Sequence, residues 1–246
     1  MSLGLRTEGT NTKLLVMDLH IHSCLSPCAD LTMVPSMICN ANLDVFSVTD
    51  HNSAWNVAVF QRRCSSKLFI PGIEIHTAED VHVLGYFPNV HDALKVSSIV
   101  EGLMDKFEYD PERFGYQVIL DDEENFSGLV EYYLGFPTKV TLDRAVELIH
   151  SHGGIAVLAH VDRKFGAMYQ LGLIPDVTNI VEVRNKETWL SLKKKGYVVL
   201  TSSDAHTPDE VGVRKSYLEV LRGEELSTEK VIRKVSAGHV RTLWEI

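Results

Sequence analysis

Short apolar runs alternate with helical patterns along most of this chain, and several of the runs end in histidine or a carboxylate. The first covers residues 14–22, where an apolar stretch leads into Asp18, His20 and His22. A run of this length predicts a buried strand, and its period of two places His20 and His22 on one face. Further runs end in the same residue types at residues 49–51, 72–76, 158–160 and 203–206. Such side chains bind zinc, manganese or iron, so their recurrence at strand ends indicates a metal site.

The order of the predicted elements indicates an α/β protein. Strands are expected at about 44–49, 67–75, 81–87, 155–159, 179–183 and 197–201, with helical patterns following most of them. In a (β/α) barrel the carboxyl ends of the strands converge on one rim, where active sites are built. The sequence therefore predicts that ligands distant along the chain meet in space.

Residues 88–139 break this alternation and predict a helical or irregular insertion that could shape a pocket. The segment is rich in acidic and aromatic residues. Its acidic run at 121–124 has no histidine partner and no calcium-loop spacing, which favours a solvated turn. Tyr116, Phe126 and Tyr132 could stack a nucleobase, although packing in the core is the more common role of such residues.

Size and charge narrow the classes of function. A chain of 246 residues with 45% hydrophobic residues can bury a full core, so we expect one domain at residues 13–246 after a flexible tail at residues 1–12. The net charge of -9 argues against capture of long nucleic acid, while bound metal ions would still allow a local nucleotide site. No apolar run has the length of a membrane span or the form of a signal peptide, and a cytoplasmic location is expected.

The chain contains the four cysteines Cys24, Cys28, Cys39 and Cys64, all in its first quarter. Structural zinc usually needs two close cysteine pairs, and only Cys24 and Cys28 lie near each other. We therefore expect four free thiols in a reducing cytosol.

With these residues assembled, the sequence resembles the PHP (polymerase and histidinol phosphatase) superfamily of metal-dependent phosphoesterases. The matching pieces follow the order of that family at residues 18–23, 49–51, 72–74, 159–160 and 203–206. The resemblance implies a distorted (β/α)7, TIM-like barrel that holds two or three divalent ions of zinc, manganese or iron.

The resemblance also implies how the ligands are shared. One metal would take His20, His22, Glu74 and Asp204; a second would take Glu74 as a bridge with His82 and His160; a third would take Asp30, His51 and His206. Asp30 departs from the common family spacing because a longer loop precedes it. His82 alternates with apolar neighbours, yet it returns close to Glu74 after a short turn.

These ligands imply hydrolysis of a phosphate ester by metal-activated water. Asp204 and His206 are the candidate catalytic residues, able to orient that water or protonate the leaving group. Arg163 and Arg184 are candidates to bind a substrate phosphate. The substrate is expected to be a small phosphorylated metabolite or a nucleotide. A short-oligonucleotide exonuclease and a non-catalytic or regulatory metal-binding domain are the alternatives, and no oligomeric state is predicted.

Overall fold

The computed structural model describes residues 11–246. Ten residues of the predicted tail at 1–12 lie outside the described part, and the first strand already begins at Thr12. The strands are β1 Thr12–Ile21, β2 Val45–Val48, β3 Leu68–His76, β4 His82–Tyr86, β5 Val118–Leu120, β6 Phe126–Leu129, β7 Ile155–Leu158, β8 Ile180–Glu182, β9 Val198–Leu200, β10 Ser216–Leu221 and β11 Val240–Thr242. The helices are α1 Pro35–Ile38, α2 Val57–Arg63, α3 Val90–Gly102, α4 Pro111–Phe114, α5 Leu142–Ser151, α6 Ala167–Gln170, α7 Lys186–Lys194 and α8 Thr228–Ser236.

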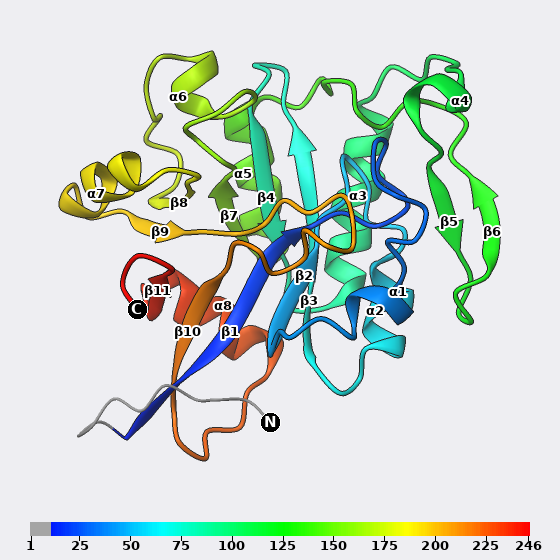
Figure 1. The fold of residues 1–246 in the computed structure, drawn as a ribbon. Coiled ribbons are helices and arrows are strands. Elements are labelled where there is room, and N and C mark those ends of the chain that lie inside the picture. Colours follow the sequence, from blue (N-terminus) through cyan, green and yellow to red (C-terminus); the bar gives the residue numbers. More distant parts are fainter. Residues whose placement is uncertain (1–10) are drawn as a thin grey trace.

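Within the described residues, nine strands form one sheet in the order β11-β10-β1-β2-β3-β4-β7-β8-β9 (Figure 1). Strands β1, β2 and β3 pair in parallel, as do β7, β8 and β9, while β4 is antiparallel to both β3 and β7. The two parallel groups therefore run the same way and share one rim. The sheet nearly closes where Ile21 bridges Ala205, whose carbonyl accepts a 2.9 Å hydrogen bond from the His22 amide. The predicted distorted barrel is confirmed, with β4 and β10 reversed in direction.

A β-bulge interrupts β1 near its carboxyl end. Asp18 lies opposite Phe46 of β2, but Ile21 lies opposite Val48, so β1 carries one extra residue between these pairs. Such a bulge shifts the alternation of side chains by one position. Leu19 accordingly packs in one buried cluster, and Ile21 packs in the other. The simple period of two expected for residues 14–22 is therefore interrupted at the functional end of the strand.

The two faces of the sheet have separate hydrophobic cores. Apolar residues of α2, α3 and α5 pack on one face, with side chains such as Phe60, Val96 and Ile149. On the other face Val231 and Val235 of α8 pack with residues of β1, β3 and β4. Burial on both faces explains why the strands read as nearly continuous apolar runs. No helix among the described residues is long and apolar enough to cross a membrane.

The segment at 88–139 contains α3, which packs on the sheet, and then α4 and a β5–β6 hairpin, which stand at the right of Figure 1. The hairpin was not predicted because its strands are short and lack clear alternation. Its turn is the acidic run at 121–124, where the Asp121 carboxylate accepts hydrogen bonds from the amides of Glu123 and Asn125. The interpretation of this run as a solvated turn fits the structure.

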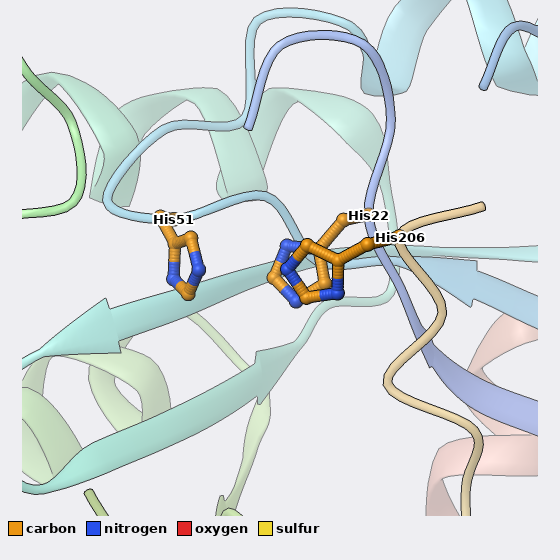
Figure 2. A group of neighbouring side chains, drawn as sticks. All are labelled: His22, His51 and His206. Carbon is orange, nitrogen blue, oxygen red and sulfur yellow. The ribbon is translucent and has the colours of Figure 1, made fainter. Parts of the chain in front are cut away.

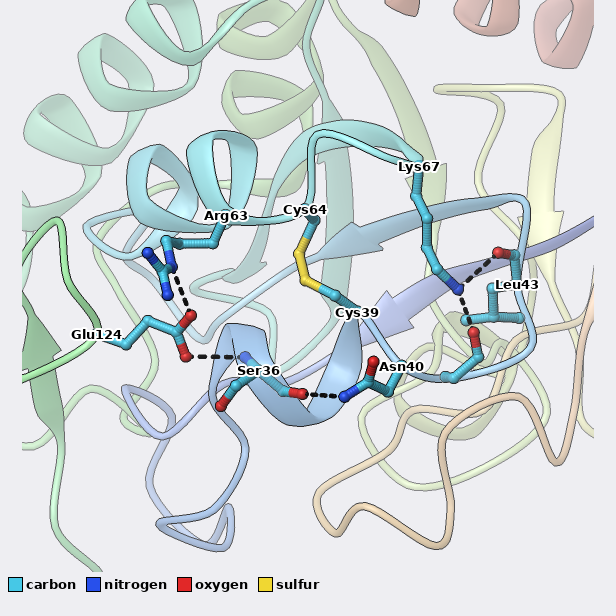
Figure 3. Close-up of a disulfide and its surroundings, with 9 residues drawn as sticks. Ser36, Cys39, Asn40, Leu43, Arg63, Cys64, Lys67 and Glu124 are labelled. Carbon is cyan, nitrogen blue, oxygen red and sulfur yellow. Dashed lines mark hydrogen bonds and ion pairs between the residues drawn. A yellow bond between two sulfur atoms is a disulfide. The ribbon is translucent and has the colours of Figure 1, made fainter.

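Cys39 and Cys64 form a disulfide between the ends of α1 and α2, at a sequence separation of 25 (Figure 3). The prediction of four free thiols is therefore wrong for these two, and only Cys24 and Cys28 are free in the described residues. Spacing along the sequence could not reveal the pairing, because packing of α1 on α2 brings the two residues together. The free thiols were one reason to expect a cytoplasmic location, and the disulfide removes that reason.

Replacing both Cys39 and Cys64 with alanine should lower the free energy of unfolding by about 3 kcal/mol, because the open loop gains conformational entropy in the unfolded chain. Urea denaturation of the oxidised protein checks this value. Cys28→Ala, which removes an exposed free thiol, is the control. Equal midpoints for the double variant and the control would contradict the prediction.

Candidate metal centre

The carboxylate of Glu74 lies at the centre of the shared rim and is fully buried. Histidines delivered by β1, by the loops after β1, β2 and β7, and by β4 surround it. The distances from its oxygens are 3.3 Å to His20 Nε2, 3.4 Å to His22 Nε2, 2.9 Å to His51 Nδ1, 2.8 Å to His82 Nδ1 and 3.3 Å to His160 Nε2. A single carboxylate that contacts this many imidazoles could bind a cation together with them.

Asp204 and His206 complete the cluster from the loop after β9. The Oδ1 atom of Asp204 lies 3.1 Å from His22 Nε2 and 3.3 Å from His20 Nε2. The ring of His206 stacks on that of His22 at 4.2 Å between centroids, and His51 lies beside them (Figure 2). Loops that follow three different strands thus place ligand atoms within one small volume.

The side chains fit metal ions in both geometry and chemistry. The ligand atoms lie within 4.8 Å of one another in each of three groups, His20-His22-Asp204, His51-Glu74-His82 and His22-His51-His206. Buried polar atoms without a hydrogen bond belong to the same cluster, among them His82 Nε2 and His160 Nδ1. Unpaired buried polar atoms are costly, and a bound cation would satisfy them. Mixed imidazole and carboxylate ligands suit zinc, manganese or iron.

Eight of the nine predicted ligands come together in this cluster, and Asp30 does not. Its carboxylate is exposed and accepts hydrogen bonds of 2.8 Å and 2.6 Å from the amide and hydroxyl of Thr32. Only the backbone of Asp30 reaches the cluster, through a 2.8 Å bond from its amide to the carbonyl of His206. His22 takes the place that the resemblance gave to Asp30 beside His51 and His206.

Glu182 at the end of β8 is a functional residue that the sequence analysis missed. It is fully buried, and its carboxylate accepts a hydrogen bond from His20 Nδ1 at 3.1 Å. This contact leaves His20 Nε2 free to face Glu74 and Asp204. A carboxylate behind a ligating histidine fixes the tautomer and raises its basicity. The signal was present, because Glu182 also ends an apolar run.

A second buried chain of hydrogen bonds orients His22. Its Nδ1 donates to Ser26 Oγ at 2.8 Å, and the Ser26 hydroxyl donates to Asp50 at 2.8 Å. The Asp50 carboxylate also accepts hydrogen bonds from the amide and hydroxyl of Ser23 at 2.7 Å and 2.6 Å. This chain keeps His22 Nε2 unprotonated and turned towards the cluster.

Asp18 fastens β1 to the loop that carries Asp204. Its carboxylate is buried and accepts bonds from the amides of Ser203 at 3.1 Å and Gly212 at 2.9 Å. Burial raises the pKa of Asp18 to about 6, although these hydrogen bonds act to lower it.

Asp204 and His160 have positive φ angles of 55° and 26°, which are unfavourable for residues other than glycine. Strain of this kind persists where the surrounding structure fixes a functional side chain.

The two buried carboxylates of the cluster, Glu74 and Asp204, have lowered pKa values. Burial alone would raise the pKa of Glu74, but the interactions of its carboxylate with His82 and His20 outweigh burial and hold the pKa well below its usual range. In Asp204 burial is likewise outweighed, mainly by His20, and the pKa is lowered. Both carboxylates are therefore ionised at neutral pH.

The histidines divide into two classes. Burial would lower the pKa of His20, but Asp204 and Glu182 raise it well above the usual value. Burial and the neighbouring His206 lower the pKa of His22, and burial lowers that of His82 to about 3. His22 and His82 are therefore neutral near pH 7, the state that a metal ligand requires.

Two adjoining cavities open over the cluster. One, of about 260 Å³, is lined by ligands of the cluster together with Arg163, Tyr133 and Phe165. The other, of about 330 Å³, shares Arg163, Asp204 and His206 with the first and adds Arg184 and Arg214. Arg163 contacts Asp204 Oδ2 at 2.6 Å, and Arg184 donates to the Ser203 carbonyl at 2.6 Å. Both predicted phosphate-binding arginines thus lie beside the cluster.

No protein-family model matches the chain, and no curated protein matches it. Solved structures do resemble it. A lesion-specific endonuclease, EndoQ, from Pyrococcus furiosus has a TM-score of 0.66 at 15% identity and covers 94% of this chain. Endonuclease Q in complex with a 27-mer duplex substrate has a TM-score of 0.63 at 14% identity with the same 94% coverage. In both cases this chain spans 58% of the endonuclease's length.

A two-domain protein from Bacteroides vulgatus gives a TM-score of 0.57 at 14% identity. It contains a predicted PHP-like metal-dependent phosphoesterase, and the match covers 96% of this chain and 66% of the other. This chain therefore has the PHP-like barrel fold. At these identities the likeness establishes the fold, and the chemistry depends on the site.

Replacing Glu182 with glutamine should weaken metal binding by about 10- to 100-fold, because His20 loses the charge that raises its basicity. Titration of the metal-free protein with Zn²⁺ in a calorimeter measures this change. Glu187→Gln alters an exposed glutamate on α7 and serves as the matched control. Equal affinities in the two variants would show that Glu182 has no role in tuning His20.

Proposed function

We propose that the chain is a metal-dependent phosphoesterase that hydrolyses a small phosphorylated metabolite or a nucleotide. The observation that carries the proposal is the buried cluster around Glu74, with arginines lining the adjoining cavity. A purely structural metal site is normally closed by its own ligands, whereas a catalytic site keeps access for substrate. Cavities of about 260 Å³ and 330 Å³ give that access here.

The eight clustered ligands would hold two or three divalent ions, with Glu74 as the bridge and His20, His22, His51, His82, His160, Asp204 and His206 around it. Such ions neutralise phosphate oxygens and lower the pKa of a water molecule from about 15.7 towards 7. The other steps belong to the protein. Glu182 and Ser26 keep His20 and His22 in the required tautomers, so that the cluster changes little on binding.

Asp204 and His206 are the proposed catalytic residues. Burial lowers the pKa of His206, so its imidazole is neutral near pH 7 and can accept a proton from water. Its Nδ1 lies 3.0 Å from the Asp204 carbonyl, so Nε2 is the one free nitrogen, and His206 takes this role when that atom is not bound to an ion. Asp204 is ionised and can orient the water, and the proton that His206 takes from the water can pass to the leaving oxygen.

Arg163 and Arg184 are the proposed phosphate ligands. Guanidinium groups bind phosphate through paired N–H donors, and both line the 330 Å³ cavity. The side chain of Arg163 is 41% exposed and forms an ion pair with Asp204. Because this pair is partly open to solvent, the guanidinium could turn to a bound phosphate with little loss of free energy. Arg214 Nη1 contacts the Arg184 carbonyl and supports this wall of the cavity.

The size of the cavities and the net charge of -9 favour a small substrate. Endonuclease Q acts on a duplex, which keeps cleavage of nucleic acid, including short oligonucleotides, as the second candidate. A regulatory domain without catalysis would need a reason to keep both the complete ligand cluster and its open cavities. We further propose that the enzyme is cytoplasmic.

Metal-loaded protein should hydrolyse phosphomonoesters or phosphodiesters from a panel, and His20→Ala should lose at least 100-fold in kcat, because the lost ligand disrupts the ions that activate water. Phosphate release, or loss of the diester by chromatography, measures the rate. His150→Ala, which alters an exposed histidine of α5, is the matched control. No turnover of any ester at full metal occupancy would refute the proposal and favour the regulatory alternative.

A further inference from the structure

Aromatic side chains from the segment at 88–139 gather around Tyr133, which lines the cavity over the metal cluster. The ring of Tyr133 lies 4.9 Å from that of Phe136, 5.6 Å from Phe114 and 5.6 Å from Tyr109. Phe107 contacts Phe136 at 6.3 Å. These rings come from α4, from the loop before it and from the loop after the β5–β6 hairpin. We call Phe107, Phe114, Tyr133 and Phe136 the aromatic platform.

The platform is open to solvent, unlike an ordinary hydrophobic core. Phe107, Phe114 and Phe136 are 61%, 44% and 45% exposed. Adjacent exposed aromatic rings are unfavourable in water, and contiguous patches of this kind commonly mark binding sites. Arg113 lies 5.5 Å from the centre of the Phe114 ring and adds a positive charge at the edge of the platform.

Tyr133 joins the platform to the metal cluster. It lines the same 260 Å³ cavity as Glu74 and Arg163. Its ring packs on Gly135, where an added Cβ would lie only 2.7 Å from the ring, so the chain at residue 135 is shaped around Tyr133. The carbonyl of Gly135 accepts a 3.2 Å hydrogen bond from His76 Nδ1, which anchors this loop to β3. The ring is therefore held in place at the cavity wall.

We propose that the aromatic platform stacks the base of a nucleotide whose phosphate lies over the metal cluster. The position of the phosphate rests on the proposed function. Stacking suits a flat base because every base offers a π-face to an aromatic side chain, and Arg113 can add a cation–π contact. A sugar phosphate without a base would leave the platform uncovered. The aromatic platform thus favours nucleotides over phosphorylated substrates that have no base.

The test compares adenosine 5′-monophosphate with ribose 5-phosphate, which carries the same phosphate and sugar without the base. Phe136→Ala should lower the ratio of kcat/KM for the nucleotide to that for the sugar phosphate about 10-fold, since stacking contributes this much per base. Phe114→Ala is a second exposed variant with the same expected direction. The matched control is Tyr169→Ala, a 68% exposed aromatic residue on α6 outside the platform, which should leave the ratio unchanged.

A tetra-adenylate oligonucleotide distinguishes two sources of the base. A reduced ratio with the monophosphate assigns the platform to a free nucleotide, and a reduced ratio with the oligonucleotide alone assigns it to the end of a strand. Both results support stacking. Equal losses for the base-containing and base-free esters, or no change in the ratio with either, would overturn it.

Direct binding separates this inference from the proposed function. If metal-loaded protein cleaves none of these esters, the phosphoesterase proposal fails, and calorimetry with adenosine 5′-monophosphate and the oligonucleotide then tests the platform alone. An affinity about 10-fold weaker in Phe136→Ala than in Tyr169→Ala would still support stacking. Equal affinities, or no binding by the unmodified protein, would overturn it and leave the patch as a surface for another protein.

Discussion

A fully buried carboxylate must be matched by charge or hydrogen bonds, and in this protein that carboxylate is Glu74. Histidines from several strand ends meet it at 2.8–3.4 Å, and no apolar arrangement could replace them without leaving the charge unpaired. Their own nitrogens are in part unsatisfied, as His82 and His160 illustrate. The cluster therefore makes physical sense as a cation site, and the barrel is the scaffold that brings its ligands together.

The surrounding structure supports this centre at some cost to local geometry. A bulge interrupts β1 just before His22, and Asp18 links the same strand to the loop of Asp204 by a hydrogen bond. Asp204 itself adopts a left-handed backbone. Behind the ligands, Glu182 and the Ser26–Asp50 pair decide which imidazole nitrogen faces the metal site. Precision at the rim thus depends on residues that would never touch a substrate.

The sequence predicted much of this because ligand residues at the ends of apolar runs report directly on strand ends. His20, Glu74, His160 and Asp204 were predicted in this way, and they meet as a barrel rim requires. Contacts that depend on three-dimensional packing could not be read from the sequence. The Cys39–Cys64 disulfide, the extra residue in β1 and the turning away of Asp30 belong to this class. Glu182 is different, since its place at a strand end was visible but a single glutamate carried no motif.

The most direct test of the account is a crystal structure of the protein grown with Mn²⁺ and measured for anomalous scattering. The account predicts peaks on both sides of Glu74, one beside His20, His22 and Asp204 and another beside His51 and His82. Crystals grown in saturating Mn²⁺ that show no peak near Glu74, or peaks only at surface carboxylates, would contradict the claim that this buried cluster is a metal centre.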